Sequence, residues 1–166
     1  MDGLWLITEK ENIRCEYRNL LAEQEHLYGL YIFHPVLGPV IILDESLKNH
    51  RRLHKCVLAE EIGHYNTAPR SNYLIAYGSY NNKIIMSQDE RKALQWATDF
   101  LIPDVDLTKA VHSGCRSCFE LAEYFDVTEW LVYRKLGFLK MCFRRTGLKV
   151  RGKDLFDIQT APCLYL

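Results

Sequence analysis

Apolar and polar residues follow a strand-like pattern in three short stretches near the start of the chain. Residues 13–18 alternate apolar and polar positions, and residues 29–33 and 40–43 are short runs rich in β-branched, aromatic and other apolar residues. The segment between the last two stretches contains Pro35 and Pro39, which remove backbone donors and predict a turn. The pattern therefore predicts a short helix over 2–11, one strand, and then a β-hairpin.

Longer stretches with helical spacing follow the strands. The first predicted helix begins at Ser46, its expected N-cap, and continues to about residue 66, just before Pro69. The polar, tyrosine-rich segment 70–87 comes next and predicts an irregular region with a short strand over 83–86.

A second long helix is predicted over 88–101, between Ser87 as its N-cap and Pro103 as its end. Three shorter helices are predicted after it, over 105–112, 120–125 and 129–140. A three-residue turn separates the last two, which predicts a helix-turn-helix-like module. We therefore expect an α+β fold, with one domain over 1–103 and a helical module over 104–166.

Composition narrows the class of protein. The 166 residues carry 21 Lys and Arg against 21 Asp and Glu, so no global charge favours nucleic acid or an anionic membrane. No apolar run is long enough for a membrane span, and residues 1–8 lack the basic start of a signal peptide. We therefore expect a cytoplasmic protein whose six cysteines are reduced.

The first long helix carries the residues with the clearest chemistry. Glu60, Glu61 and His64 form an E-E-x-x-H motif, a variant of the H-E-x-x-H motif of metallopeptidases. Residues four apart share a helix face, so Glu60 and His64 can both bind one metal ion. Glu90, near the start of the next helix, is the best third ligand. The alternative is that these carboxylates are solvated surface groups and that His64 is a cation at a helix end.

The motif helix and the helix after it resemble the ImmA/IrrE family of metallo-endopeptidases. The similar segments read L-A-E-E-I-G-H-Y over 58–65, E-R-K-A over 90–93 and W-A-T-D-F-L-I-P over 96–103. The resemblance extends over nearly the whole chain. It implies a zincin-like peptidase domain with a small antiparallel or mixed sheet, a motif helix and a glutamate helix.

The resemblance also implies the role of each residue. His64 and Glu90 match two metal ligands, Glu60 occupies the place of the first histidine, and Glu61 matches the general base that activates the metal-bound water. The expected metal is Zn²⁺, and the extra carboxylate makes Mn²⁺ or Fe²⁺ more competitive. His54 could help only if the helix broke between it and His64.

The implied substrate is a protein, specifically a helix-turn-helix repressor that keeps a prophage or other mobile element silent. An edge strand is expected to pair with the extended substrate backbone. Four tyrosines remain open as oxyanion donors: Tyr65, Tyr73, Tyr77 and Tyr80.

Two other functions are weighed beside proteolysis. One is an inactive pseudo-peptidase that binds the repressor without cutting it. The other is DNA binding through the basic residues between Arg134 and Lys153, although Glu129 and Trp130 stand where base-reading residues would lie. The Cys115-x-x-Cys118 pair could hold zinc or undergo redox chemistry, but a cysteine-containing loop before a helix explains it more simply.

Overall fold

The computed structural model describes residues 2–22, 24–69 and 80–146, with no account of the side chains within 80–87 and 143–146. The chain divides into two compact units, Met1–Ala97 and Thr98–Leu166. Each unit is described by itself. No helix in the described part of the chain has the length and apolar composition needed to cross a membrane.

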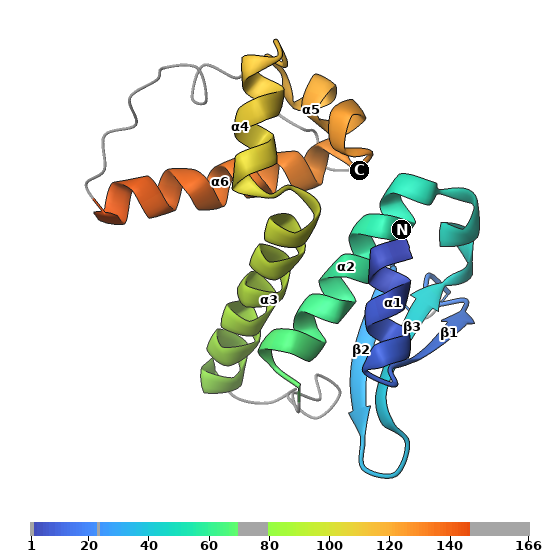
Figure 1. Cartoon of the computed structure of the whole chain (residues 1–166). Helices are drawn as coiled ribbons and strands as arrows, with labels where there is room; N and C mark the ends of the chain where they lie inside the picture. The colour runs from blue at the N-terminus through green and yellow to red at the C-terminus, as the bar shows by residue number, and fades with distance from the viewer. Residues whose placement is uncertain (1, 23, 70–79, 147–166) are drawn as a thin grey trace. The chain divides into compact units, whose positions relative to one another are not determined.

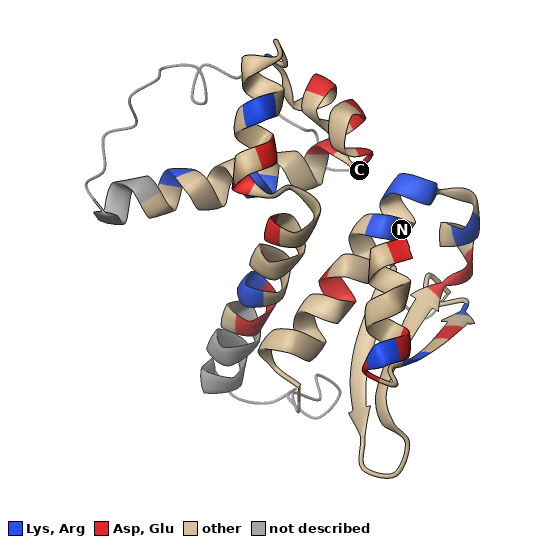
Figure 2. Cartoon of the chain, viewed as in Figure 1, with Lys and Arg blue, Asp and Glu red and all other residues tan. Residues whose placement is uncertain are grey.

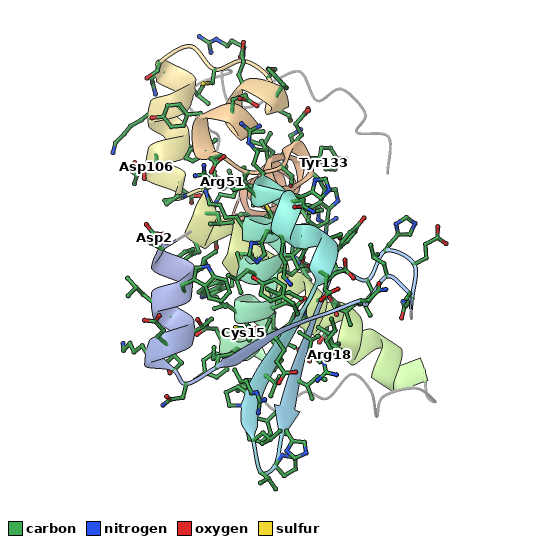
Figure 3. The ribbon with its side chains drawn as sticks, turned by 90° about the vertical axis from the view of Figure 1, so that its right-hand side faces the viewer. Asp2, Cys15, Arg18, Arg51, Asp106 and Tyr133 are labelled. Atoms are coloured by element: carbon green, nitrogen blue, oxygen red, sulfur yellow. The ribbon has the colours of Figure 1, made fainter. Side chains whose placement is uncertain are left out.

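The first unit contains a mixed sheet of strands β1 (Arg14–Arg18), β2 (Gly29–His34) and β3 (Gly38–Asp44), in the order β1-β3-β2. β3 pairs in parallel with β1 and antiparallel with β2, so the predicted hairpin is confirmed. The central strand is the most apolar: Ile41 and Leu43 share one face and are fully buried. Figure 3 marks β1 by Cys15 and Arg18.

β2 lies at one edge of the described sheet, and its register determines where its backbone groups point. The Asp44 N–H donates to the Tyr28 carbonyl at 2.8 Å, so these two residues form a hydrogen-bonded antiparallel pair. Such pairs alternate along the strands, which makes the Gly29–Leu43 and Tyr31–Ile41 pairs non-hydrogen-bonded. The backbone groups of Gly29 and Tyr31 therefore point away from β3, toward the edge of the sheet.

Two helices of the first unit lie beside this sheet (Figure 1). α1 spans Asp2–Lys10, as predicted, and contacts α2, which also packs on β2 and β3. The predicted helix over 46–66 is two elements, a 3₁₀ helix η1 (Glu45–Asn49) and α2 (Arg51–Thr67). The break lies at His50, whose backbone (φ −126°, ψ 73°) is not helical.

Ser46 is not the N-cap that the sequence predicts. Asp44 caps η1 instead, because its carboxylate accepts from the Ser46 N–H at 2.9 Å. The same carboxylate accepts from the Leu21 N–H at 3.0 Å and so also holds the segment that connects β1 to β2. One buried side chain therefore fixes both connections.

α3 (Tyr80–Leu101) begins eight residues before the predicted start. The expected strand over 83–86 is wrong, since these residues are helical, and Ser87 lies within the helix rather than at its start. A short apolar run has the same pattern in a strand and in a buried helix. Continuing α3 bonds its backbone donors internally, whereas an isolated strand would leave them without partners.

The second unit contains α4 (Asp104–His112), α5 (Cys118–Phe125) and α6 (Glu129–Thr146), close to the predicted ranges. α5 begins with a capping box between Ser117 and Glu120, and Asp126 ends it in the left-handed conformation at φ 53°. α5 and α6 pack together across the short turn. Whether this pair is a helix-turn-helix module remains a prediction.

Two basic residues of α6 contact other side chains of the helical unit. Lys135 is fully buried, and its Nζ lies 2.6 Å from Asp99 Oδ1 and 2.5 Å from Asp104 Oδ1. The Arg134 guanidinium carbon lies 5.8 Å and 5.6 Å from the ring centroids of Trp130 and Phe138. Both cations are therefore occupied by contacts within the helical unit.

Candidate functional site

Three ionisable side chains of the motif lie on α2, whose helix is continuous over its whole length. α2 buries Leu58 and Ile62 completely where it packs beside the sheet. Glu61 and His64 are also buried, with exposed fractions of 7% and 4%, whereas Glu60 is partly exposed. Figure 2 shows this acidic stretch in the middle of α2, with the basic residues confined to the N-terminal end of the helix.

α3 approaches α2 closely at Gly63. A Cβ at this position would overlap the main-chain carbonyl oxygen of Ala93 and lie 2.9 Å from the carbonyl carbon. Glu90 precedes Ala93 by three residues and therefore lies on the same side of α3. This contact brings Glu90 Oε2 to 3.4 Å from His64 Nε2. The second long helix thus supplies a carboxylate to the motif histidine, as the sequence predicts.

Glu61 lies against the edge strand β2. A Cβ at Gly29 would lie 2.5 Å from Glu61 Oε1, so the missing side chain of the glycine leaves room for the carboxylate. The Tyr31 backbone N–H, which points to the edge of the sheet, donates to this carboxylate. Burial, together with the charges of Glu60 and Glu90, raises the pKa of Glu61 to about 8, because these effects outweigh the lowering effects of His64 and the Tyr31 N–H.

His64 is held between carboxylates. Burial alone would lower its pKa, but the Glu90 hydrogen bond and the charges of Glu61, Glu90 and Glu60 together raise it. Three carboxylates therefore surround one imidazole, and two of the four groups are almost inaccessible to solvent. The raised pKa values let Glu61 and His64 carry protons that offset this negative charge, and a bound cation would have the same effect.

The His64–Glu90 pair has a separation that suits a shared metal ion. In a tetrahedral site with metal–ligand distances of about 2.0–2.1 Å, two ligand atoms lie about 3.3 Å apart. The imidazole nitrogen and carboxylate oxygen stand 3.4 Å apart. These donor types are those of catalytic zinc sites. The pair therefore fits two ligands of one ion.

The third predicted ligand is not brought into such a group. Among the described residues, no three His, Cys, Asp or Glu side chains are arranged so that they could hold a metal ion as they lie. Glu60 is near enough to affect the pKa of both Glu61 and His64, and it shares a helix face with His64. A side-chain rotation of Glu60 would be needed to complete the set.

His54 does not belong to this site. α2 does not break between His54 and His64, so about 15 Å of helix separates them. His54 is buried elsewhere, with its Nε2 3.0 Å from the Tyr17 hydroxyl and its ring beside Trp5. Burial lowers the pKa of His54, as expected for an imidazole in the core.

Of the four predicted oxyanion donors, only Tyr65 has a described side chain. The Tyr65 hydroxyl donates to Glu11 Oε2 at 2.9 Å, and its ring meets the Tyr31 ring edge-on. Tyr73 and Tyr77 lie outside the described residues, as does the side chain of Tyr80.

Neither cysteine of the C-x-x-C pair forms a disulfide within the described residues. Cys118 is buried in the first turn of α5, and Cys115 is partly exposed. Neither belongs to a metal-binding group within the described part of the chain. The positions agree with the simpler interpretation of a loop entering a helix.

Two residues of the site have no signal in the sequence. Gly29 and Tyr31 belong to a strand that is about thirty residues from the motif in the chain. Their position against Glu61 depends on the pairing register of β2 and on the packing of α2 beside this strand. Gly63, in contrast, stands inside the motif, where a glycine between buried residues indicates a close backbone approach.

Comparison with known families agrees with this geometry. A family model described as the IrrE N-terminal-like domain, Peptidase_M78, matches residues 8–136. The matched range includes the strands, α2, α3 and most of the helical unit. Neither the curated proteins nor the solved structures gave a significant match. Because the family model covers well over half of the 166 residues, the chain belongs to the Peptidase_M78 family of IrrE N-terminal-like domains.

Proposed function

We propose that this chain is a metal-dependent endopeptidase in which His64, Glu90 and Glu60 hold the ion and Glu61 is the general base. The family assignment supports a peptidase-type enzyme and implies a metal ion. The observation that carries the proposal is the 3.4 Å approach of His64 Nε2 and Glu90 Oε2 from two helices, with the buried Glu61 carboxylate beside them.

The donor set favours particular ions. One imidazole and two carboxylates form a harder and more anionic site than two imidazoles and one carboxylate. Zn²⁺ accepts such ligands and is the proposed ion, while Mn²⁺ and Fe²⁺ bind more competitively than they would at two histidines. When bound, the ion would polarise a water molecule and the carbonyl of the peptide bond.

Glu61 handles the proton in this proposal. A nearby cation favours the charged form of a carboxylate, so ion binding would oppose the effect of burial and keep Glu61 ionised at neutral pH. The carboxylate then takes the proton of the attacking water and delivers it to the leaving amine. Its position at the sheet edge keeps it next to a substrate that lies along β2.

The substrate is proposed to bind as an extended segment along the edge of β2. This edge lies beside Glu61, whose carboxylate already accepts from the Tyr31 N–H, so the substrate would pair with other backbone groups of β2. By family resemblance, the substrate is a helix-turn-helix repressor of a prophage or other mobile element. A repressor substrate would place the reaction in the cytoplasm.

Cleavage can be tested without knowing the repressor. The zinc-loaded protein is incubated with a mixed peptide library, and products are identified by mass spectrometry. New peptide ends that depend on the ion and disappear in Glu61→Gln support the proposal, and Glu9→Gln on α1 serves as the matched control. The absence of cleavage by the zinc- and manganese-loaded protein on both the library and co-expressed candidate repressors would contradict it.

A binding role without cleavage is the second function to consider. It is favoured by Glu60, because a carboxylate in place of the first histidine makes the ion a weaker Lewis acid. A pseudo-peptidase would retain repressor binding in both the parent and Glu61→Gln.

DNA binding is less well supported. Of the basic residues toward the C-terminus, Lys135 is buried between two aspartates and Arg134 lies against aromatic rings. Arg144, Arg145 and Lys149 lie outside the residues with described side chains. Neutralising these three would weaken DNA affinity and flatten its salt dependence if the chain were a DNA-binding regulator.

A further inference from the structure

The Glu61 carboxylate lies at the edge of β2, in the space that a side chain at position 29 would fill. The exposed edge of β2 would normally present its N–H and C=O groups to solvent or to another strand. The Tyr31 N–H donates to the Glu61 carboxylate instead. The carboxylate can reach this donor because residue 29, two positions before it on the same edge, has no side chain.

The space at position 29 is limited on two sides. An added Cβ would lie 2.5 Å from Glu61 Oε1 and 2.6 Å from Val57 Cγ1, both on α2. Val57 is β-branched and stiff, whereas the end of the Glu61 side chain can rotate. An alanine here would therefore displace the carboxylate first. Gly29 is not among the described residues with a left-handed backbone, so alanine causes no strain of its own there.

We propose that Gly29 is a positioning residue for Glu61, which keeps the carboxylate hydrogen-bonded to the Tyr31 N–H at the β2 edge. Its catalytic consequence depends on the peptidase function proposed above. Gly29 touches neither the ion site nor the reacting atoms and acts only through Glu61. Replacing it should therefore lower kcat for peptide cleavage while leaving zinc affinity unchanged.

The rival explanation is that Gly29 only allows α2 and β2 to pack closely through Val57. The two explanations separate in a mutant cycle on the metal-free protein. If Glu61 is the group that Gly29 accommodates, Gly29→Ala should cost little Tm in a Glu61→Ala background and its full cost in a Val57→Ala background. If Gly29→Ala instead keeps its full cost in the Glu61→Ala background and costs little in the Val57→Ala background, packing through Val57 is the explanation and the proposal is overturned.

The direct test is hydrogen exchange at the Tyr31 amide, resolved by NMR. Losing the hydrogen bond to the Glu61 carboxyl group should speed exchange by roughly tenfold or more. We expect this increase in both Gly29→Ala and Glu61→Ala, and no change in Gly137→Ala, a helical glycine whose added Cβ would meet no atom within 4 Å. Unchanged Tyr31 exchange in Gly29→Ala would overturn the proposal.

These readouts keep the two proposals separate. Exchange and Tm require neither an ion nor a substrate, so they test the positioning role even if the chain cleaves no peptide. If the chain does cleave peptides, Gly29→Ala should reduce kcat by about tenfold or more with little change in KM. A normal kcat together with accelerated Tyr31 exchange would contradict the catalytic part alone.

Discussion

Gly63 of α2 lies directly against the main-chain carbonyl of Ala93 on α3, with no room between them for a methyl group. This contact sets the distance between the two helices that carry His64 and Glu90. The motif glycine therefore has a structural reason that is connected to the site: it lets the second ligand-bearing helix approach the first.

Replacing Gly63 by alanine should damage both stability and the site. The new methyl would overlap a backbone carbonyl that cannot rotate away, so we expect a loss of about 1–3 kcal/mol in the free energy of unfolding. Urea unfolding monitored by circular dichroism measures this loss. Gly137→Ala, in open space on α6, should instead be neutral or stabilise by up to about 1 kcal/mol. Equal effects at both glycines would disprove the close-contact explanation.

Restoring the histidine at position 60 should strengthen the site. In Glu60→His an imidazole replaces a carboxylate on the helix face that carries His64, which recreates the H-E-x-x-H pattern. We expect tighter Zn²⁺ binding in competition with a chelator, and a lower preference for Mn²⁺. Glu60→Gln, which removes charge without adding a good ligand, should bind Zn²⁺ more weakly than the parent. Tighter binding by Glu60→Gln would show that residue 60 is not a ligand.

The pH dependence of stability should include a contribution from His54. Because burial lowers its folded-state pKa below the unfolded value, the unfolded state binds more protons as the pH falls below about 6.5. The contribution of His54 to stability therefore falls with decreasing pH through that value, until its folded-state pKa is reached. Urea unfolding of the metal-free protein between pH 7.5 and about pH 5 would measure the slope.

The control for this effect is a pair of substitutions. His54→Gln should remove this part of the slope, since no imidazole is left to titrate. Tyr17→Phe should retain it, because burial rather than the Tyr17 hydroxyl lowers the pKa of His54. An unchanged slope in His54→Gln would assign the acid sensitivity to other groups.

Lys135 gives a prediction for the helical unit. Its ammonium is buried, while the side chains of its partners Asp99 and Asp104 are 56% and 67% exposed. Replacing both aspartates by asparagine should destabilise the chain by about 1–3 kcal/mol, because the buried charge loses its partners while solvent compensates for part of the loss. Lys135→Met keeps the volume without the charge and should be close to neutral in thermal unfolding. A larger loss in Lys135→Met than in the double variant would contradict this account.

The sequence predicted the secondary structure best where pattern and capping agreed. The hairpin around Pro35 and Pro39 and the helices of the second unit followed from local signals. The predictions failed at helix starts, where tertiary contacts compete with local preference. Asp44 rather than Ser46 caps η1, because its carboxylate also holds the Leu21 backbone.

The residues of the candidate site also fall into those that the sequence indicated and those that it did not. Spacing on one helix grouped Glu60, Glu61 and His64, and both the position of Glu90 on the next helix and the family resemblance pointed to this residue, which the structure brings to His64. No local pattern pointed to Gly29 or Tyr31, because their role depends on how β2 pairs with β3 and packs beside α2. Such relations arise only when distant segments fold together.

Glu60, His64 and Glu90 are proposed to hold one metal ion together, and the metal content of the purified protein tests this proposal. The protein is purified without chelator, and bound metal is quantified by mass spectrometry in the parent and in Glu60→Ala, His64→Ala and Glu90→Ala. We expect close to one equivalent in the parent and a loss in all three variants. Retention of metal in Glu60→Ala would require a different third ligand. A parent that binds no metal after incubation with Zn²⁺ or Mn²⁺ would contradict the claim.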